Sequence, residues 1–144
     1  MKRWIWTFTP LILLLLLTAC GGKAAGSPAE TIQAMSDAYD AGDQDAIMAL
    51  YTADSIVTIT NDIVIHGSDI EKWVSGDIEA GNRLTATEIK EVGEIASFTG
   101  TLYDGNGLPL LIALFEARVV KGQIVNMMLT ELIDLPGAMA PVEP

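Results

Sequence analysis

The sequence contains one cysteine and one histidine, so it is poor in the residues that most often act as nucleophiles, bases and metal ligands. A single cysteine cannot form a disulfide within the chain. One histidine among scattered acidic residues provides no set of ligands at a metal-binding spacing. The sequence also lacks a glycine-rich phosphate loop and a Gly-x-Ser-x-Gly motif. We therefore expect no metal and no cofactor.

Basic residues are also scarce, because 8 Lys and Arg stand against 19 Asp and Glu, for a formal net charge of −11. A domain of this charge repels the phosphate backbone of nucleic acids and the headgroups of anionic lipids. At 144 residues, the chain has room for one domain. The composition therefore predicts a single acidic domain that does not bind nucleic acid.

The longest apolar run lies at the start of the chain, where Lys2 and Arg3 precede a segment from Trp4 to Ala19. A charged start, an apolar centre and an end of small residues are typical of a secretory signal. A membrane-spanning helix needs about 20 mostly apolar residues, whereas this run is shorter and contains Pro10. We therefore predict a signal peptide over residues 1–19.

The end of that run, Leu-Thr-Ala-Cys-Gly, resembles the lipobox of bacterial lipoproteins. In that family a diacylglycerol is attached to the cysteine, and the signal is removed just before it. The resemblance implies a lipid on Cys20, which would anchor the protein in the cell envelope on the extracytoplasmic side, at the outer face of the plasma membrane or at an outer membrane. A catalytic thiol would need a structured pocket, whereas Cys20 opens a flexible linker over residues 20–27. Removal of Lys2 and Arg3 would take the net charge from −11 to −13.

Three helices are predicted in the first half of the domain, which spans residues 28–135 and is followed by a loose tail at 136–144. The first helix begins at a capping box of Ser27 and Glu30 and ends at Gly42. Two more helices follow, and each carries apolar residues on one side. The second is capped by Asp43 and includes Ile47, Leu50 and Tyr51, and the third is capped by Ser68 with Glu71 and includes Ile70, Trp73, Val74 and Ile78.

Extended segments make up most of the remaining sequence. Two short β-branched segments precede the third helix, and four longer ones follow Arg83 with tight turns between them. This order predicts an α+β domain, in which helices pack on one side of a curved sheet. The expected strands are residues 55–60, 63–66, 84–92, 94–104, 108–120 and 123–134.

Three stretches, at residues 38–57, 66–74 and 121–129, resemble the SnoaL-like branch of the nuclear-transport-factor-2-like (NTF2-like) superfamily. Their sequences are AYDAGDQDAIMALYTADSIV, HGSDIEKWV and KGQIVNMML. The resemblance implies a cystatin-like, cone-shaped fold, in which a curved antiparallel sheet is covered by three N-terminal helices. It also implies a pocket between the sheet and the helices and, commonly, a homodimer.

The known catalytic residues of that superfamily have no matching set in this sequence. The position of the steroid-isomerase base falls on Thr60, the oxyanion tyrosine has no equivalent on the first helix, and the second oxyanion donor falls near Leu114. The Asp–Arg–Asp set of the epoxide hydrolases is approached only by Glu116 and Arg118, together with Glu131. The comparison of motifs therefore favours ligand binding without catalysis.

A two-residue turn at residues 121–122 sets the expected register of the last two strands, pairing Val120 with Gln123 and Glu116 with Met127. Both faces of this strand pair are mostly apolar, whereas the strands of a sheet with one solvent-exposed face alternate between apolar and polar residues. We therefore expect one face to line the pocket and the other to pack on a second copy, and a slip of one residue would exchange them. The expected pocket face holds Leu114, Glu116, Arg118, Met127, Leu129 and Glu131, and the expected dimer face holds Leu111, Ala113, Phe115, Ala117, Asn126, Met128, Thr130 and Leu132.

Two titratable side chains, His66 and Glu131, are the candidates for catalysis. A histidine titrates usefully near neutral pH, although a lone one at the end of a strand is more often a surface residue. A buried Glu131 would have to be paired or protonated, and a salt bridge with Arg83 or Arg118 is the alternative. The candidates for the ligand pocket are Trp73, Leu114, Glu116, Met127, Leu129 and Glu131; for Trp73, plain core packing is the alternative.

Three functions follow from these observations. The one we favour is an exported, lipid-anchored domain that binds a small apolar or amphipathic ligand in its pocket without chemistry, because the expected pocket face is apolar. The second is a small-molecule enzyme of the cyclase, dehydratase or hydrolase type that uses Glu131 and His66. The third is a homodimeric module that recruits a protein partner at the membrane surface.

Overall fold

The computed structural model describes residues 26–134. The predicted signal peptide, Cys20 and the predicted tail at 136–144 lie outside the described residues. Within the described part, no helix has the length and apolar character needed to cross a membrane.

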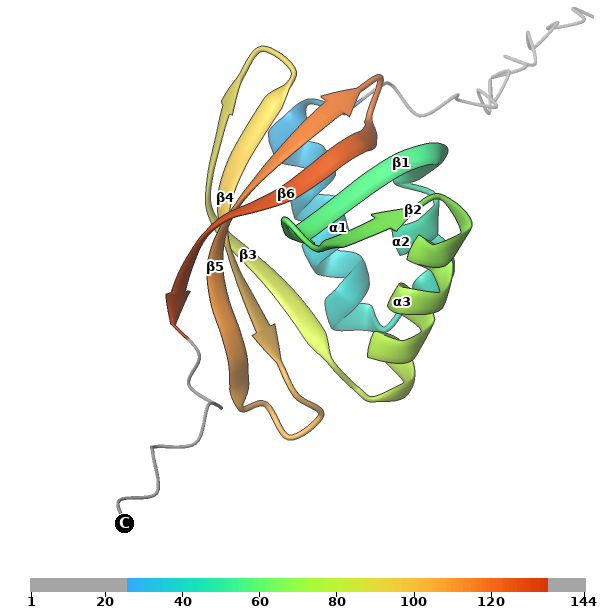
Figure 1. The fold of residues 1–144 in the computed structure, drawn as a ribbon, viewed down its shortest axis with the longest axis vertical. Coiled ribbons are helices and arrows are strands. Elements are labelled where there is room, and N and C mark those ends of the chain that lie inside the picture. The colour runs from blue at the N-terminus through green and yellow to red at the C-terminus, as the bar shows by residue number, and fades with distance from the viewer. Residues whose placement is uncertain (1–25, 135–144) are drawn as a thin grey trace, which may run out of the picture.

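The described chain forms three helices and six strands in the order helix, helix, hairpin, helix and four-stranded meander (Figure 1). This confirms the predicted α+β class and element order. The largest difference in a boundary is at Tyr51, which begins a strand rather than extending the second helix, and three later strands differ from the prediction by one residue at one or both ends. The elements are α1 (Pro28–Ala41), α2 (Gln44–Met48), β1 (Tyr51–Thr60), β2 (Ile63–His66), α3 (Ser68–Glu79), β3 (Arg83–Val92), β4 (Ile95–Tyr103), β5 (Pro109–Val120) and β6 (Gln123–Asp134).

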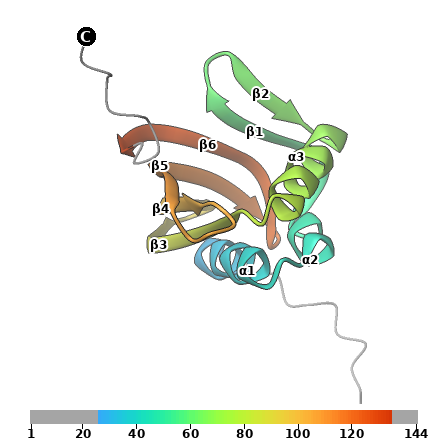
Figure 2. The ribbon, with the colours of Figure 1, turned by 90° about the horizontal axis from the view of Figure 1, so that it is seen from below.

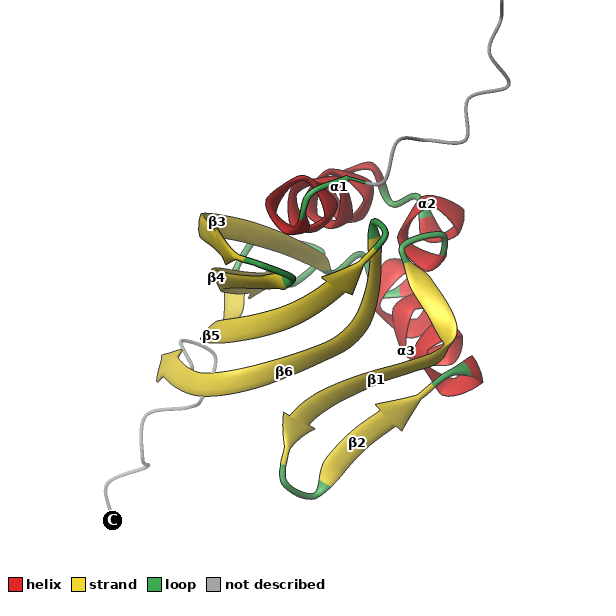
Figure 3. Cartoon of the chain, turned by 90° about the horizontal axis from the view of Figure 1, so that it is seen from above, coloured by secondary structure: helices red, strands yellow, loops and turns green. Residues whose placement is uncertain are grey.

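The six strands form one curved sheet in the order β2-β1-β6-β5-β4-β3 (Figure 3). Strands β3 to β6 form the predicted antiparallel meander. Strand β1 pairs with β6 in parallel, so the sheet is antiparallel at every junction except this one. The first hairpin therefore extends the sheet beside the last strand of the chain.

The buried core lies between the helices and one face of this sheet. Its members fall between Ile32 and Met127, so a fragment of residues 21–144 contains every residue of this core. Figure 2 shows α1 beside β3 and β4, and α3 on the side of β1 and β2. The largest fully buried side chains are Tyr39, Ile32, Met35, Ile47, Ile70, Ile124, Met127, Val57, Val74 and Ser55.

Helix α1 is held at its N-terminus and along its length. The predicted capping box is confirmed, because the Ser27 side chain accepts a hydrogen bond from the Glu30 N–H and the Glu30 carboxylate accepts one from the Ser27 N–H. The Glu91 carboxylate on β3 accepts a further bond from the Ala29 N–H at 2.8 Å. The buried Ser36 hydroxyl accepts one from the Ala86 N–H at 3.1 Å. These bonds attach α1 to β3.

Helix α3 starts differently from the prediction. Its N-cap is Gly67, and no side chain caps it, so the expected capping box of Ser68 and Glu71 is wrong. Gly67 has φ +41°, and a Cβ there would clash with the carbonyl oxygen of Ala53. Only a glycine fits at this position, so close to Ala53 and with a positive φ. With Gly67 as the N-cap, Ser68 is the first residue of the helix instead of its cap.

The register of β5 and β6 also differs from the prediction, because irregularities near Arg118 and Leu114 change the pairing. Glu116 pairs with Met128 rather than Met127, and Leu114 pairs with Glu131. Each bulge adds a residue that a count from the turn cannot foresee. The expected faces of β5 are therefore exchanged: Leu111, Ala113, Phe115 and Ala117 face the helices, and Leu114, Glu116 and Arg118 lie on the opposite face.

Candidate functional site

A small apolar cavity lies between α3 and the inner face of the sheet, where the resemblance to the NTF2-like superfamily implies a pocket. Its volume is about 40 Å³. The lining comes from α1, α3 and all strands except β2, so the cavity exists only in the assembled fold. The lining residues are Tyr39, Ile59, Trp73, Asp77, Leu84, Leu102, Leu111, Phe115 and Met127.

The cavity is small because its lining side chains fill most of the space between α3 and the sheet. A volume of about 40 Å³ is close to the share of one water molecule in the liquid, about 30 Å³. Pockets for drug-sized ligands measure roughly 300–1,000 Å³. Any ligand larger than a few atoms would therefore have to displace lining groups, and the half-buried Trp73 on α3 is the largest of them that reaches the protein surface.

Two of the lining residues, Asp77 from α3 and Tyr39 from α1, carry a polar group, although the surface of the cavity itself is almost entirely apolar. Burial raises the pKa of the Asp77 carboxyl, and the hydrogen bond that Asn82 Nδ2 donates to its Oδ1 at 3.0 Å acts in the opposite direction. Burial also raises the pKa of Tyr39, and the nearby Tyr51 and Asp77 add to that effect. The Tyr39 hydroxyl therefore keeps its proton and acts as a hydrogen-bond donor at neutral pH.

The two buried tyrosines use their hydroxyls differently. Tyr51 directs its hydroxyl at the sulfur of Met35, at 3.6 Å, and at that of Met127, at 4.0 Å. Tyr39 is only 2% exposed, but no buried side-chain oxygen or nitrogen of the described residues lacks a hydrogen-bond partner, so its hydroxyl keeps contact with solvent. Tyr39 therefore contributes mainly its ring to the lining of the cavity, whose surface is almost entirely apolar.

The predicted pocket residues separate into two groups. Trp73 and Met127 line the cavity, and Leu129 packs against the core beside it. Leu114, Glu116 and Glu131 lie on the opposite face of the sheet, because the bulges exchange the faces of β5 and turn the end of β6. The interpretation of these three as inward-facing is therefore wrong.

Tyr39 and Asp77 were absent from the predicted site. The sequence did hold a signal for Asp77, since it follows Trp73 by four residues and thus lies on the apolar stripe of its helix. A carboxylate on such a stripe is unusual. Tyr39 gave no comparable signal, because an aromatic residue on the apolar side of a helix is most often a core residue.

The structure does not bring His66 and Glu131 together. Both are exposed, and His66 lies on β2 opposite Ile56 of β1, which in turn pairs with Asn126 of β6. Glu131 lies five residues further along β6, roughly 16 Å away along the strand direction. The proposed acid–base pair of the enzyme hypothesis is therefore wrong, and His66 instead lines an open surface hollow with Asp54 and Asp69.

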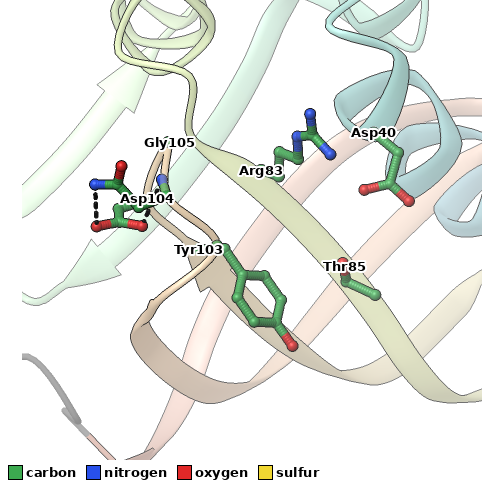
Figure 4. Close-up of a pocket in the computed structure, with 8 residues that line it drawn as sticks. Asp40, Arg83, Thr85, Tyr103, Asp104 and Gly105 are labelled. Carbon is green, nitrogen blue, oxygen red and sulfur yellow. Dashed lines mark hydrogen bonds between the residues drawn. The ribbon is translucent and has the colours of Figure 1, made fainter.

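An open groove of about 450 Å³ lies beside the turn between β4 and β5 (Figure 4). The Asp104 carboxylate accepts hydrogen bonds from the N–H groups of Asn106 and Leu108 at 2.8 Å, which hold its pKa below the usual range. It lies apart from Asp40 and Arg83 on the other side of the groove. Its role is therefore to shape its own turn.

Metal binding finds no support in the described part of the chain. Within residues 26–134, no three or more His, Cys, Asp or Glu side chains are grouped closely enough to hold an ion. Of the acidic side chains described above, Glu30 caps α1, Asp104 shapes its turn and Asp77 lines the cavity under α3. The cone cavity, with Tyr39 and Asp77, is thus the candidate site.

Comparison with known proteins gives structural matches only. No family model and no curated protein matches the sequence. An NTF2-like protein of unknown function from Burkholderia pseudomallei is 20% identical, with 74% of this chain and 92% of that chain covered and a TM-score of 0.59. A cystatin-fold protein from Novosphingobium aromaticivorans is 18% identical, with 76% and 99% covered and a TM-score of 0.61. SalBIII, an epoxide hydrolase/cyclase-like enzyme in pyran ring formation in polyether salinomycin, is 15% identical, with 72% and 89% covered and a TM-score of 0.64.

These matches confirm the predicted cystatin-like, NTF2-like fold. Identities of this size carry no information on the reaction or the ligand.

Proposed function

We propose that this NTF2-like domain binds a small, mainly apolar molecule in the cavity between α3 and the sheet. The observation that carries the proposal is the cavity itself. Its walls are apolar side chains that come from α1, α3 and the sheet. Mainly apolar concave sites with a few polar groups are typical of ligand pockets.

Binding would require the cavity to widen, and α3 is the element best suited to move. It buries only Ile70 and Val74 completely, and it lacks a side-chain cap. Elements with few buried contacts open at lower free energy than the rest of a domain. An outward shift of α3 would carry Trp73 and Asp77 away from the sheet and enlarge the cavity.

Trp73 makes this proposal easy to test. The other tryptophans, Trp4 and Trp6, precede Cys20, so Trp73 is the single tryptophan of a fragment of residues 21–144. Incorporated 5-fluorotryptophan would then report on the cavity in ¹⁹F NMR. We expect toluene to shift the Trp73 resonance in a saturable manner.

A pair of matched variants locates the binding. Ile59→Phe adds a ring to a residue that lines the cavity and should abolish the toluene-induced shift. Ile56→Phe makes the same change on the same strand, at a residue that faces the outer hollow beside His66, and should leave the shift intact. No saturable shift in the unsubstituted fragment, or an equal response in both variants, would refute cavity binding.

We also propose that the protein is anchored by a lipid on Cys20, for which the support is the lipobox-like sequence. Stable attachment to a membrane requires more than one acyl chain. Mass spectrometry of the protein from its host should show a mature chain that begins at Cys20 and carries acyl groups. The Cys20→Ser variant should lack them, and a full-length, unmodified wild-type chain would contradict the proposal.

We further propose that the domain forms a homodimer through the outer face of the sheet. Ile95, Leu110 and Met128 are exposed on this face, at 36%, 36% and 42%. Exposed apolar side chains on a broad sheet face are typical of protein interfaces. Sedimentation velocity should give a dimer, and Met128→Lys should give a monomer; a monomeric wild type would refute this.

A further inference from the structure

We infer that the open groove beside the turn between β4 and β5 binds a small zwitterion of the α-amino acid class, whose carboxylate pairs with Arg83 and whose ammonium group pairs with Asp40. This groove is separate from the cavity under α3, because no residue lines both. The inference therefore stands apart from the proposed function.

The turn at one end of the groove is fixed by hydrogen bonds and by packing. The Asp104 carboxylate accepts hydrogen bonds from the N–H groups of Asn106 and Leu108. The same turn lies against the connection from α3 to β3, where a Cβ on Gly105 would come within 2.9 Å of the Ala80 carbonyl oxygen. Because glycine has no Cβ, the two segments can approach this closely. The groove is therefore formed before a ligand arrives, which lowers the cost of binding.

The charged side of the groove comes from β3 and from the end of α1. Arg83 is the first residue of β3 and lies directly opposite Tyr103 of β4. Residues opposite each other on antiparallel strands have Cβ atoms about 4.5–5.5 Å apart, so these two side chains start side by side. Asp40 borders the same groove from α1, and Figure 4 shows it on the side where Arg83 lies. A cation, a carboxylate and an aromatic ring thus border one groove.

The two charges are available to a ligand. Neither Asp40 nor Arg83 forms an ion pair within residues 26–134, although both border the groove and both side chains are exposed. The groove measures about 450 Å³, and sites for small molecules measure roughly 300–1,000 Å³. The groove therefore offers one positive and one negative charge in a space that suits a small molecule.

A zwitterion matches this pair of charges better than a simple ion does. Arginine holds a carboxylate through two parallel hydrogen bonds, and a carboxylate such as that of Asp40 accepts hydrogen bonds from an ammonium group. A plain anion would be repelled by Asp40 and by the net charge of −11, and a plain cation would be repelled by Arg83. An α-amino acid pairs with both charges, and the Tyr103 ring offers its side chain an apolar surface.

The test compares L-phenylalanine with two analogues that each lack one charge, N-acetyl-L-phenylalanine and L-phenylalanine amide, at pH 6. Binding is followed in the 21–144 fragment by ¹H–¹⁵N correlation spectra, in which the N–H groups of Gly105 and Gly107 report on the groove. We expect phenylalanine to bind about fivefold more tightly than either analogue. This ratio corresponds to about 1 kcal/mol, the upper end for an exposed ion pair.

Variants that remove one charge assign the two contacts. Arg83→Gln should remove the advantage of phenylalanine over its amide and keep the advantage over the N-acetyl form. Asp40→Asn should do the reverse. Arg118→Gln and Asp45→Asn make the same changes at exposed residues outside the groove and should keep both preferences. Thermal melts confirm that each variant is folded.

Four results would overturn the inference. The first is the absence of a saturable shift with phenylalanine, and the second is equal binding of phenylalanine and either analogue. The third is an equal loss from Arg83→Gln and Arg118→Gln, which would reduce the effect to the overall charge of the domain. The fourth is a set of shifts confined to α3, which would place the ligand in the cavity. The toluene response of Trp73 is independent of all four, so the proposed function is tested separately.

Discussion

The two long helices lie on the same side of one sheet, yet they are held in different ways. Helix α1 buries six residues, is closed by a capping box, and is bonded to β3 through Glu91 and Ser36. Helix α3 buries two residues and begins at an uncapped glycine. The cavity lies under α3. The difference indicates that the α1 side supplies the stability of the domain and the α3 side supplies a place that can open.

Truncation of core residues should show this difference most strongly. Ile32→Ala on α1 removes a side chain with no exposed surface, and it should lower the free energy of unfolding by about 2–5 kcal/mol. Ile78→Ala on α3 truncates a partly buried residue and should have a smaller effect. Urea denaturation measures both, and an equal loss at the two sites would break the comparison.

A glycine in the sheet should resist even one added methyl group. A Cβ on Gly100 would lie 2.6 Å and 2.8 Å from ring carbons of Phe115, whose ring stacks on Phe98 at a centroid distance of 5.4 Å. Because the ring would have to shift out of its packing on Phe98 to make room for the Cβ, Gly100→Ala should destabilise the domain by about 1–3 kcal/mol. Urea denaturation is again the measurement, and a neutral result would show a looser sheet core than the structure has.

The corresponding change in α3 should act in the opposite direction. Gly76 lies inside that helix, and a Cβ there meets no atom within 4 Å. Gly76→Ala should stabilise the protein by about 0.5–1 kcal/mol, because alanine loses less backbone entropy in a helix. Hydrogen exchange should slow in α3 while remaining unchanged in α1. Uniform slowing would mean that the two helices open together.

Two carboxylates should give the smallest effects, with opposite pH dependence. Hydrogen bonds from the helix N-terminus lower the pKa of Glu91, so its contribution is present above pH 4.5 and is lost as pH falls. Burial raises the pKa of Asp77, so its ionisation opposes folding at neutral pH and ceases to do so as pH falls towards 3.8. Glu91→Gln should therefore lower stability at pH 7, and Asp77→Asn should raise it.

Thermal melts between pH 3 and pH 7 measure both variants. The two differences from wild type should shrink together at low pH, where both carboxyl groups are protonated in folded and unfolded chains. A destabilising Asp77→Asn at pH 7 would mean that the carboxylate is held by more hydrogen bonds than the one from Asn82.

Local sequence was sufficient for much of the fold. The capping box of Ser27 and Glu30, the stop at Gly42 and the turn at residues 121–122 all form as predicted, because each depends on residues within a few positions of one another. The order of helices and strands follows from the same local periodicities. The predicted start of α3 was wrong, because it depends on the close approach of Ala53 to Gly67, which is a contact between distant parts of the chain.

The candidate site was predicted only in part for the same reason. Trp73 and Met127 lie in the cavity, but two bulges moved Leu114, Glu116 and Glu131 to the other face of the sheet. A bulge is a response to packing between strands, and it leaves no local pattern to read. That Tyr39 and Asp77 line the same cavity likewise depends on how two helices pack on one sheet.

The sequence by itself determined the acidic composition, the α+β order of elements and the NTF2-like fold, because composition, capping and periodicity are properties of neighbouring residues. Only the tertiary structure decided which face of the sheet packs against the helices, how small the cavity is, and which residues line it. Those features depend on register and close packing, where a shift of one residue exchanges inside for outside.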